Sequence, residues 1–157
     1  MPVTPGPGRR LQLRDAIAAA LAADGKPEGL AVRRARALPF SAKQLPAVAV
    51  YLMPELVETG PGPGTAPIAR RKLLVRVQAQ VACAADEEDV DLLLDPITTW
   101  VVQAVLADPS LGGLAITTTE RQTQFAVTED TEPVFGGATI DFVVDYLTAA
   151  ADPTRKT

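Results

Sequence analysis

The side chains that most often perform catalysis are scarce in this sequence. Its 157 residues include no histidine, one cysteine (Cys83) and only two serines, Ser41 and Ser110. A serine or cysteine nucleophile activated by histidine is therefore excluded, as is a zinc site built on histidine or on paired cysteines. The side chains left for chemistry are carboxylates, lysines, two tyrosines and the single thiol.

One carboxylate pair, Glu120 and Glu129, has the residue types that glycoside hydrolysis uses, but nothing in the sequence fixes the two groups at a working separation. Cys83 lies on the apolar side of a predicted strand, where a buried, inert thiol is expected. The acidic run from Asp86 to Asp91 lacks the glycine turn of a calcium loop, and its charges are typical of a helix start. We predict no enzymatic activity, no cofactor and no metal site.

The composition is that of a small soluble protein. It is 47% hydrophobic and 22% charged, with a formal charge of −4 and a pI near 4.8. The length predicts one domain, and the acidic balance disfavours binding to nucleic acid through phosphate contacts. No apolar run reaches the ~18–20 residues needed to cross a bilayer. Residues 1–8 lack the pattern of a signal peptide, so we expect synthesis in the cytoplasm.

The first half of the chain is predicted to contain five segments: an irregular N-terminal arm (1–8), a helix ending at a Gly25 cap (9–25), a weak strand (30–38), a confident strand (47–52) and a long loop rich in Pro and Gly (54–67). Arg9 and Arg10 stand at the helix end where the dipole favours anions. Each is therefore expected to face solvent or an acidic partner outside the domain.

The second half begins with the clearest strand, residues 70–83, in which apolar and polar side chains alternate. A helix capped by Asp86 follows, with a kink or break expected at Pro96. A long extended segment covers 114–128, and its centre, residues 120–124, is polar on both faces. A turn through Glu129, Asp130, Pro133 and Gly136–Gly137 then leads to a last strand at 138–148, and residues 149–157 form a polar tail.

This order predicts an α+β fold: a largely antiparallel sheet of four to five strands with two main helices on one face. The domain is expected to cover residues 9–148. Three predicted strands exceed the usual five or six residues, so long hairpins should protrude beyond the core. Unpaired edges of such strands recruit other chains, and separated basic and acidic clusters fit head-to-tail contacts that close into rings. The residues inferred to form such an interface are Gly60, Gly62, Gly64, Arg70, Arg71, Lys72, Arg121, Gln122, Gln124, Glu129 and Asp130.

Over residues 10–148 the chain resembles the tail terminator proteins (minor tail or tail completion proteins) of long-tailed bacteriophages and gene transfer agents. The likeness lies in the order of its segments. They are a Leu-Arg-Asp-Ala-Ile-Ala-Ala-Ala-Leu helix, a Val-Ala-Val-Tyr-Leu strand, an Arg-Lys-Leu-Leu-Val-Arg-Val-Gln-Ala-Gln-Val strand, an acidic-capped helix, Leu-Gly-Gly, and an Ala-Thr-Ile-Asp-Phe-Val-Val-Asp-Tyr strand.

The resemblance implies a subunit of a hexameric ring in the virion, at the head–tail junction. Such a ring caps the tail tube, stops its polymerisation and meets the head connector or stopper protein, while genomic DNA passes through its pore. The family implies no cofactor. Two alternatives stay open: another neck component, such as a head-completion or stopper protein, and a dimeric α+β ligand-binding module.

Overall fold

The computed structural model describes residues 8–23, 25–34, 41–64, 66–83, 89–128 and 133–154. Within them lie two α-helices, one short 3-10 helix and five strands. In chain order the elements are α1 (Arg9–Ala22), β1 (Ala31–Arg33), η1 (Ala42–Gln44), β2 (Ala47–Gly60), β3 (Ile68–Cys83), α2 (Val90–Leu106), β4 (Thr117–Thr128) and β5 (Val134–Ala149). The expected α+β class is confirmed.

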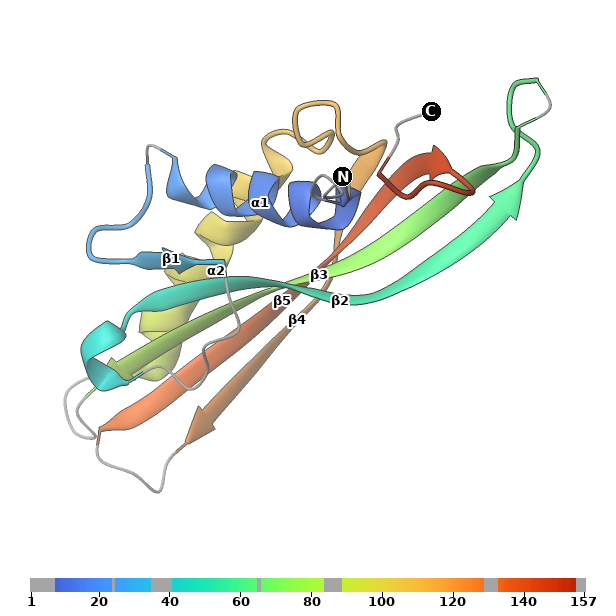
Figure 1. The fold of residues 1–157 in the computed structure, drawn as a ribbon. Coiled ribbons are helices and arrows are strands. Elements are labelled where there is room, and N and C mark those ends of the chain that lie inside the picture. Colours follow the sequence, from blue (N-terminus) through green and yellow to red (C-terminus); the bar gives the residue numbers. More distant parts are fainter. Residues whose placement is uncertain are drawn as a thin grey trace, which may run out of the picture.

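The five strands form one twisted sheet in the order β1-β2-β3-β5-β4 (Figure 1). All neighbouring strands are antiparallel except β1, which runs parallel to β2 over three residues. Both helices lie on one face of this sheet: α1 contacts β1 and β2, and α2 contacts β3, β5 and β4. The other face is not covered by either helix, so we call the two sides the helix face and the open face.

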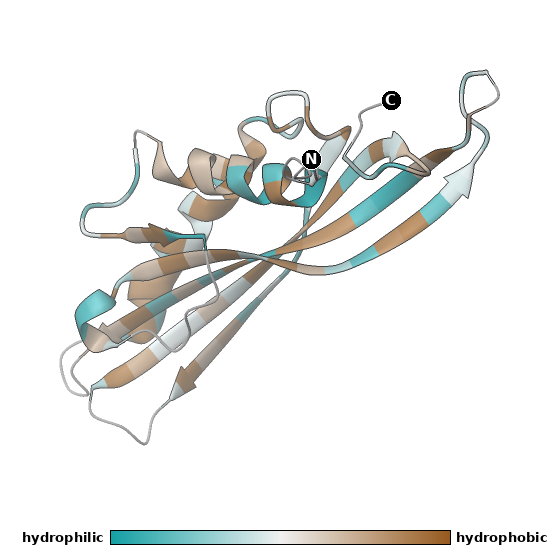
Figure 2. Ribbon diagram, in the orientation of Figure 1, coloured by the Kyte–Doolittle hydropathy of each residue, from teal (hydrophilic) through white to brown (hydrophobic). Residues whose placement is uncertain are grey.

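The core lies between the helices and the central strands. On β3 the predicted alternation is confirmed, since Val75, Val77 and Ala79 are fully buried on the helix face while Arg76 and Gln78 lie on the open face. Figure 2 shows the same alternation as apolar and polar bands along the strands. From α1 and α2, the residues Leu13, Ile17, Leu21, Leu94, Val101 and Val105 complete the core.

The segment expected as a loop at 54–67 is strand in its first half, 54–60, so the prediction was wrong there. β2 continues through Pro54 to Gly60, β3 begins at Ile68, and the two pair along their whole length. Proline is tolerated here because β1 covers only Ala47–Ala49, which leaves the outer edge of β2 without a partner strand at Pro54. A register shift between Leu52 and Glu55 takes up the irregularity.

Gly136 and Gly137 were also expected in a turn, but they lie inside β5, which begins at Val134. Gly136 is needed because a larger residue would not fit beneath α2. A Cβ atom on Gly136 would lie 2.0 Å from Cγ1 of Val90 and 3.2 Å from Cδ1 of Leu94. The glycine therefore lets the start of α2 approach the sheet closely.

The second helix starts later than predicted. Asp86 lies outside the described residues, and the cap is Asp89, whose carboxylate accepts a hydrogen bond of 3.0 Å from the Asp91 N–H. The helix then runs to Leu106 without the break expected at Pro96. Pro96 lies on the exposed side, where the missing backbone donor disturbs no packing.

Smaller differences concern the ends of elements. The first strand is three residues long rather than nine, and 35–40 lie outside the described part. Helix α1 ends at Ala22, before Gly25, which has a positive φ of 93°. The last strand extends from Val134 to Ala149, beyond the expected 138–148 at both ends.

Replacing Gly136 by alanine is expected to lower the free energy of unfolding by about 1–3 kcal/mol, because the new methyl group would overlap Val90. Urea denaturation followed by circular dichroism measures this loss. The matched control is Gly137→Ala, where the nearest atom to the new Cβ is 3.7 Å away and stability should stay nearly unchanged. Equal effects of the two variants would contradict this account of Gly136.

Candidate functional site

Three strands extend beyond the two helices and form a projection that we call the arm. It consists of residues 55–60 of β2, 68–73 of β3 and 144–149 of β5, which pair continuously. Figure 1 shows these strands continuing past the helical layer to the loop that joins β2 and β3. The base of the arm belongs to the core through Leu73, Val144 and Tyr146, and its far end lies beyond the helices.

A buried carboxylate, Glu55, fixes the base of the arm. Its side chain is 7% exposed and accepts four hydrogen bonds from three side chains, each on a different element. Arg10 of α1 donates two, at 2.9 and 2.6 Å, and Arg71 of β3 donates one at 2.9 Å. The fourth donor is the hydroxyl of Tyr146 on β5.

The same network orders Arg71, which the sequence placed at an interface. Its side chain is 8% exposed, and its Nε donates a 2.9 Å hydrogen bond to the hydroxyl of Thr148. This guanidinium is thus fully engaged within the subunit. The first residues of α1 therefore clamp the sheet where the arm begins.

The surroundings of Glu55 favour its ionised form. Burial alone would raise the pKa of the carboxyl, but the hydrogen bonds from Arg10, Tyr146 and Arg71 outweigh burial and hold the pKa below its ordinary value. Burial and the nearby carboxylate raise the pKa of the Tyr146 hydroxyl, which stays protonated and donates. The cluster at neutral pH is one carboxylate shared by two guanidinium groups.

Arg10 resolves the electrostatic conflict seen in the sequence. Its acidic partner lies within the domain, on β2, rather than outside it. Arg9 is 8% exposed and donates to Gln12 at 3.0 Å, while its Nε is buried without a hydrogen-bond partner. The two arginines at the unfavourable end of the helix dipole were the signal in the sequence that a carboxylate lies nearby, but the sequence does not show that this carboxylate is Glu55.

On the open face, two arginines are neutralised by carboxylates of the neighbouring strand. Arg76 donates to Asp141 through two hydrogen bonds of 2.7 and 2.8 Å, and Arg70 forms a forked contact with Asp145. These pairs raise the pKa of both guanidinium groups. Much of the remaining open face is uncharged and polar, with Gln78 accepting a 3.0 Å hydrogen bond from the Tyr51 hydroxyl.

The arm and the far edge of the sheet both expose apolar side chains. On β2, Leu56 is 71% exposed and Val57 is 47% exposed. On β4, the last strand of the sheet, Phe125 and Val127 are about half exposed. Leu56 and Val57 are functional candidates that the sequence analysis missed because it read 54–67 as a loop.

The predicted interface residues fall into two groups on opposite sides of the sheet. Gly60, Gly62, Gly64, Arg70 and Lys72 lie on the arm and its tip, with Arg71 buried at its base. Arg121, Gln122 and Gln124 lie exposed on β4. Glu129 and Asp130 lie outside the described residues, so the pairing of Glu120 with Glu129 considered from sequence is not described.

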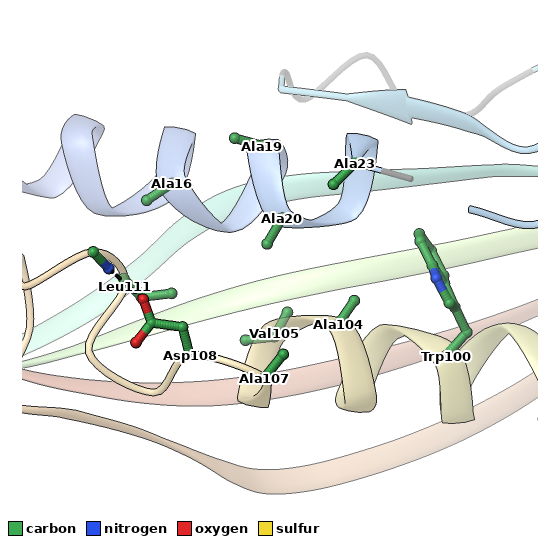
Figure 3. Close-up of a pocket in the computed structure, with 11 residues that line it drawn as sticks. Ala16, Ala19, Ala20, Ala23, Trp100, Ala104, Val105, Ala107, Asp108 and Leu111 are labelled. Atoms are coloured by element: carbon green, nitrogen blue, oxygen red, sulfur yellow. Dashed lines mark hydrogen bonds between the residues drawn. The ribbon is translucent and has the colours of Figure 1, made fainter. Parts of the chain in front are cut away.

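A groove of about 530 Å³ separates the two helices (Figure 3). Alanines of α1 form one wall, Trp100 and Ala104 of α2 contribute to the other, and Asp108 lies at one end. The Asp108 carboxylate accepts hydrogen bonds from the Ser110 hydroxyl and the Gly112 N–H, which lower its pKa. The groove thus presents mainly methyl groups.

Within the described ranges, no cluster of three or more metal-ligating side chains occurs. None of the helices there has the length and hydropathy needed to span a membrane. The site therefore belongs to an α+β sheet protein with one open face, a projecting arm and a long free edge. No model of a known protein family matches the chain, and no curated protein does.

Replacing Glu55 by glutamine is expected to lower the free energy of unfolding at pH 7 by about 3 kcal/mol, because two guanidinium groups lose their carboxylate. In the wild type, the native pKa of Glu55 is depressed. Its stabilising effect is therefore complete above about pH 4.3 and is lost as the pH falls through the native value.

Urea denaturation at several pH values measures both effects. The Glu55→Gln variant should show a flatter decline in acid than the wild type. Glu28→Gln, at an exposed position between α1 and β1, serves as the matched control and should follow the wild type. A Glu55→Gln protein as stable as this control at pH 7 would disprove the role of the cluster.

Proposed function

We propose that this chain is the tail terminator subunit of a long-tailed phage or gene transfer agent. Copies form a ring, for which the resemblance implies six subunits, at the head–tail junction of the virion. The ring caps the last ring of tail tube protein, stops its polymerisation and presents a surface to the head connector or stopper protein.

The arm is the observation that supports this proposal best. A monomer gains nothing from extending three strands beyond its own helices, and exposed strand edges are a hazard for a protein that stays alone. Here Leu56 and Val57 expose apolar surface on both faces of the arm. Contact with other subunits would remove that surface from water.

Two separate contact regions on one subunit favour a ring over a dimer. The outer edge of β2 along the arm and the outer edge of β4 are the two opposite edges of the sheet. A contact between unlike surfaces is heterologous, and it closes into a ring when the rotation between subunits allows. The two-fold symmetric, ligand-binding alternative would instead use the same surface twice.

The charge of the chain is compatible with DNA moving through such a ring. The formal net charge is −4, and the open-face arginines Arg70 and Arg76 are paired with carboxylates. Unpaired arginines and lysines are the usual anchors for phosphate groups. Pairing Arg70 and Arg76 with carboxylates would weaken retention of the duplex on the open face.

The proposal is tested with tail tubes assembled from purified tube protein. Added chain is expected to appear by electron microscopy as a ring at one tube end and to stop further growth of that end. Tubes that keep elongating, with the chain bound elsewhere or absent, would exclude a terminator. Cross-linking in virions that joins the chain to head proteins but never to tube protein would favour the stopper alternative.

A pair of equally exposed leucines tests the arm itself. Leu56→Glu should leave the subunit folded, because the side chain is 71% exposed, but should prevent ring assembly measured by native mass spectrometry. Leu92→Glu alters a side chain on α2 that is also 71% exposed, and it should still assemble. Assembly of both variants, or of neither, would show that the arm has no special part.

A further inference from the structure

The sheet ends in two backbone edges that no strand covers within the described residues. β4 is the last strand on one side, and ten of its twelve residues are exposed. On the other side, β1 covers only Ala47–Ala49, so the outer edge of β2 is open along the arm. Neither exposed stretch carries the lysines that often protect edge strands.

The two edges match in side-chain character as well. On the helix face, β4 exposes Phe125 and Val127, and the arm exposes Val57. The β4 edge carries Arg121 and the β2 edge carries Glu58, which have opposite charges. Neither forms an ion pair in the described part of the chain, since the nearby Arg70 binds Asp145.

We infer that the arm of one copy adds its β2 edge to the β4 edge of the next copy, with Glu58 facing the bulge at Arg121. This deepens the proposed ring by naming its subunit contact. The strands alternate in direction across the sheet from β2 to β4, so a second copy continuing the sheet brings β2 antiparallel to β4. Backbone hydrogen bonds of this kind supply affinity in strand addition.

The alternation of faces supports this register. Counting from Glu58 opposite Gln122, next to the bulge, places Val57 opposite Thr123 and Glu55 opposite Phe125. Val57, Thr123 and Phe125 all lie on the helix face, so the helix face of one copy continues as the helix face of the next. A shift of one residue would put Val57 beside open-face side chains instead.

The offset between the joined positions is also consistent with closure. Glu58 and Leu147 of β5 both pair with Arg70, so they lie at the same height in the sheet, whereas Gln122 pairs with Asp141 of β5. Joining Glu58 to Gln122 therefore shifts the strands by six residues along β5 at each subunit. At about 3.3 Å per residue and about 4.8 Å between strands, it tilts the strands by roughly 46° across β2, β3, β5 and β4, the four strands that each subunit would contribute. This value is close to the tilts of about 35–45° in closed sheets.

A charge exchange tests the contact in the full chain. Glu58→Arg and Arg121→Glu each create a like-charged pair at every junction and should weaken assembly about tenfold or more, measured by native mass spectrometry over a concentration series. The double variant restores opposite charges and should assemble like the wild type. Glu28→Arg and Lys26→Glu, both exposed near β1, are controls for net charge.

Cysteine pairs test the register directly. In a Cys83→Ala background, Val57→Cys with Thr123→Cys should form disulfides between copies, because directly opposed strand residues lie within disulfide reach. A ladder of covalent multimers is the expected result on oxidation. Val57→Cys with Thr117→Cys, displaced by several residues, should give no ladder.

A wild-type chain that stays monomeric, single charge variants that assemble normally while folded, or equal cross-linking by both cysteine pairs would each overturn the inference. The outcome is separable from that of the tube assay. Rings that cap tubes but fail these tests keep the terminator function and require another subunit contact. Rings joined through β4 that ignore tubes keep the contact and exclude the function.

Discussion

One buried carboxylate holds together the parts on which the rest of the molecule depends. Glu55 is the point where the first turn of α1, the irregular stretch of β2, the first part of β3 and the end of β5 meet. A buried charge is costly unless every lone pair finds a donor, so Glu55 requires Arg10, Arg71 and Tyr146 to stay in place. The cluster thereby sets where the compact core ends and where the arm begins.

The arm gains its rigidity from this arrangement. A two-stranded hairpin alone is marginally stable in water, but here β5 adds a third strand along nearly the whole arm. The base is clamped by α1 on the helix face and by the Arg70–Asp145 pair on the open face. A projection built in this way can present Leu56 and Val57 in a fixed position, as a contact surface needs.

Few side chains of this protein are of catalytic types, and many of its charged side chains form contacts within the fold. The polar network that does exist serves structure: carboxylates are shared with arginines across strands, and Asp108 closes a turn after α2. Among the described residues, β2 and β4 combine open backbone edges with exposed apolar side chains. Those are the groups through which one chain recognises another.

The sequence by itself determined the alternation of β3, the core stripes of α1 and α2, and hence the α+β class, because periodicity records which side of an element is buried. It also determined that the centre of β4, residues 120–124, is polar on both faces, as in an edge strand with little cover. The predicted interface residues on the arm and on β4 were chosen from the sequence by their charge and position.

Tertiary structure decided the rest. Pro54 and Gly136 carry the local signals of a loop and a turn, yet both lie in strands. The reasons are an unpaired outer edge beside Pro54 and a helix pressing on Gly136. Arg10 pairs with a carboxylate 45 residues away, on the part of β2 that the local pattern predicted as loop. Edge position, close approach and long-range charge pairing depend on which strands become neighbours, and no local window of residues contains that information.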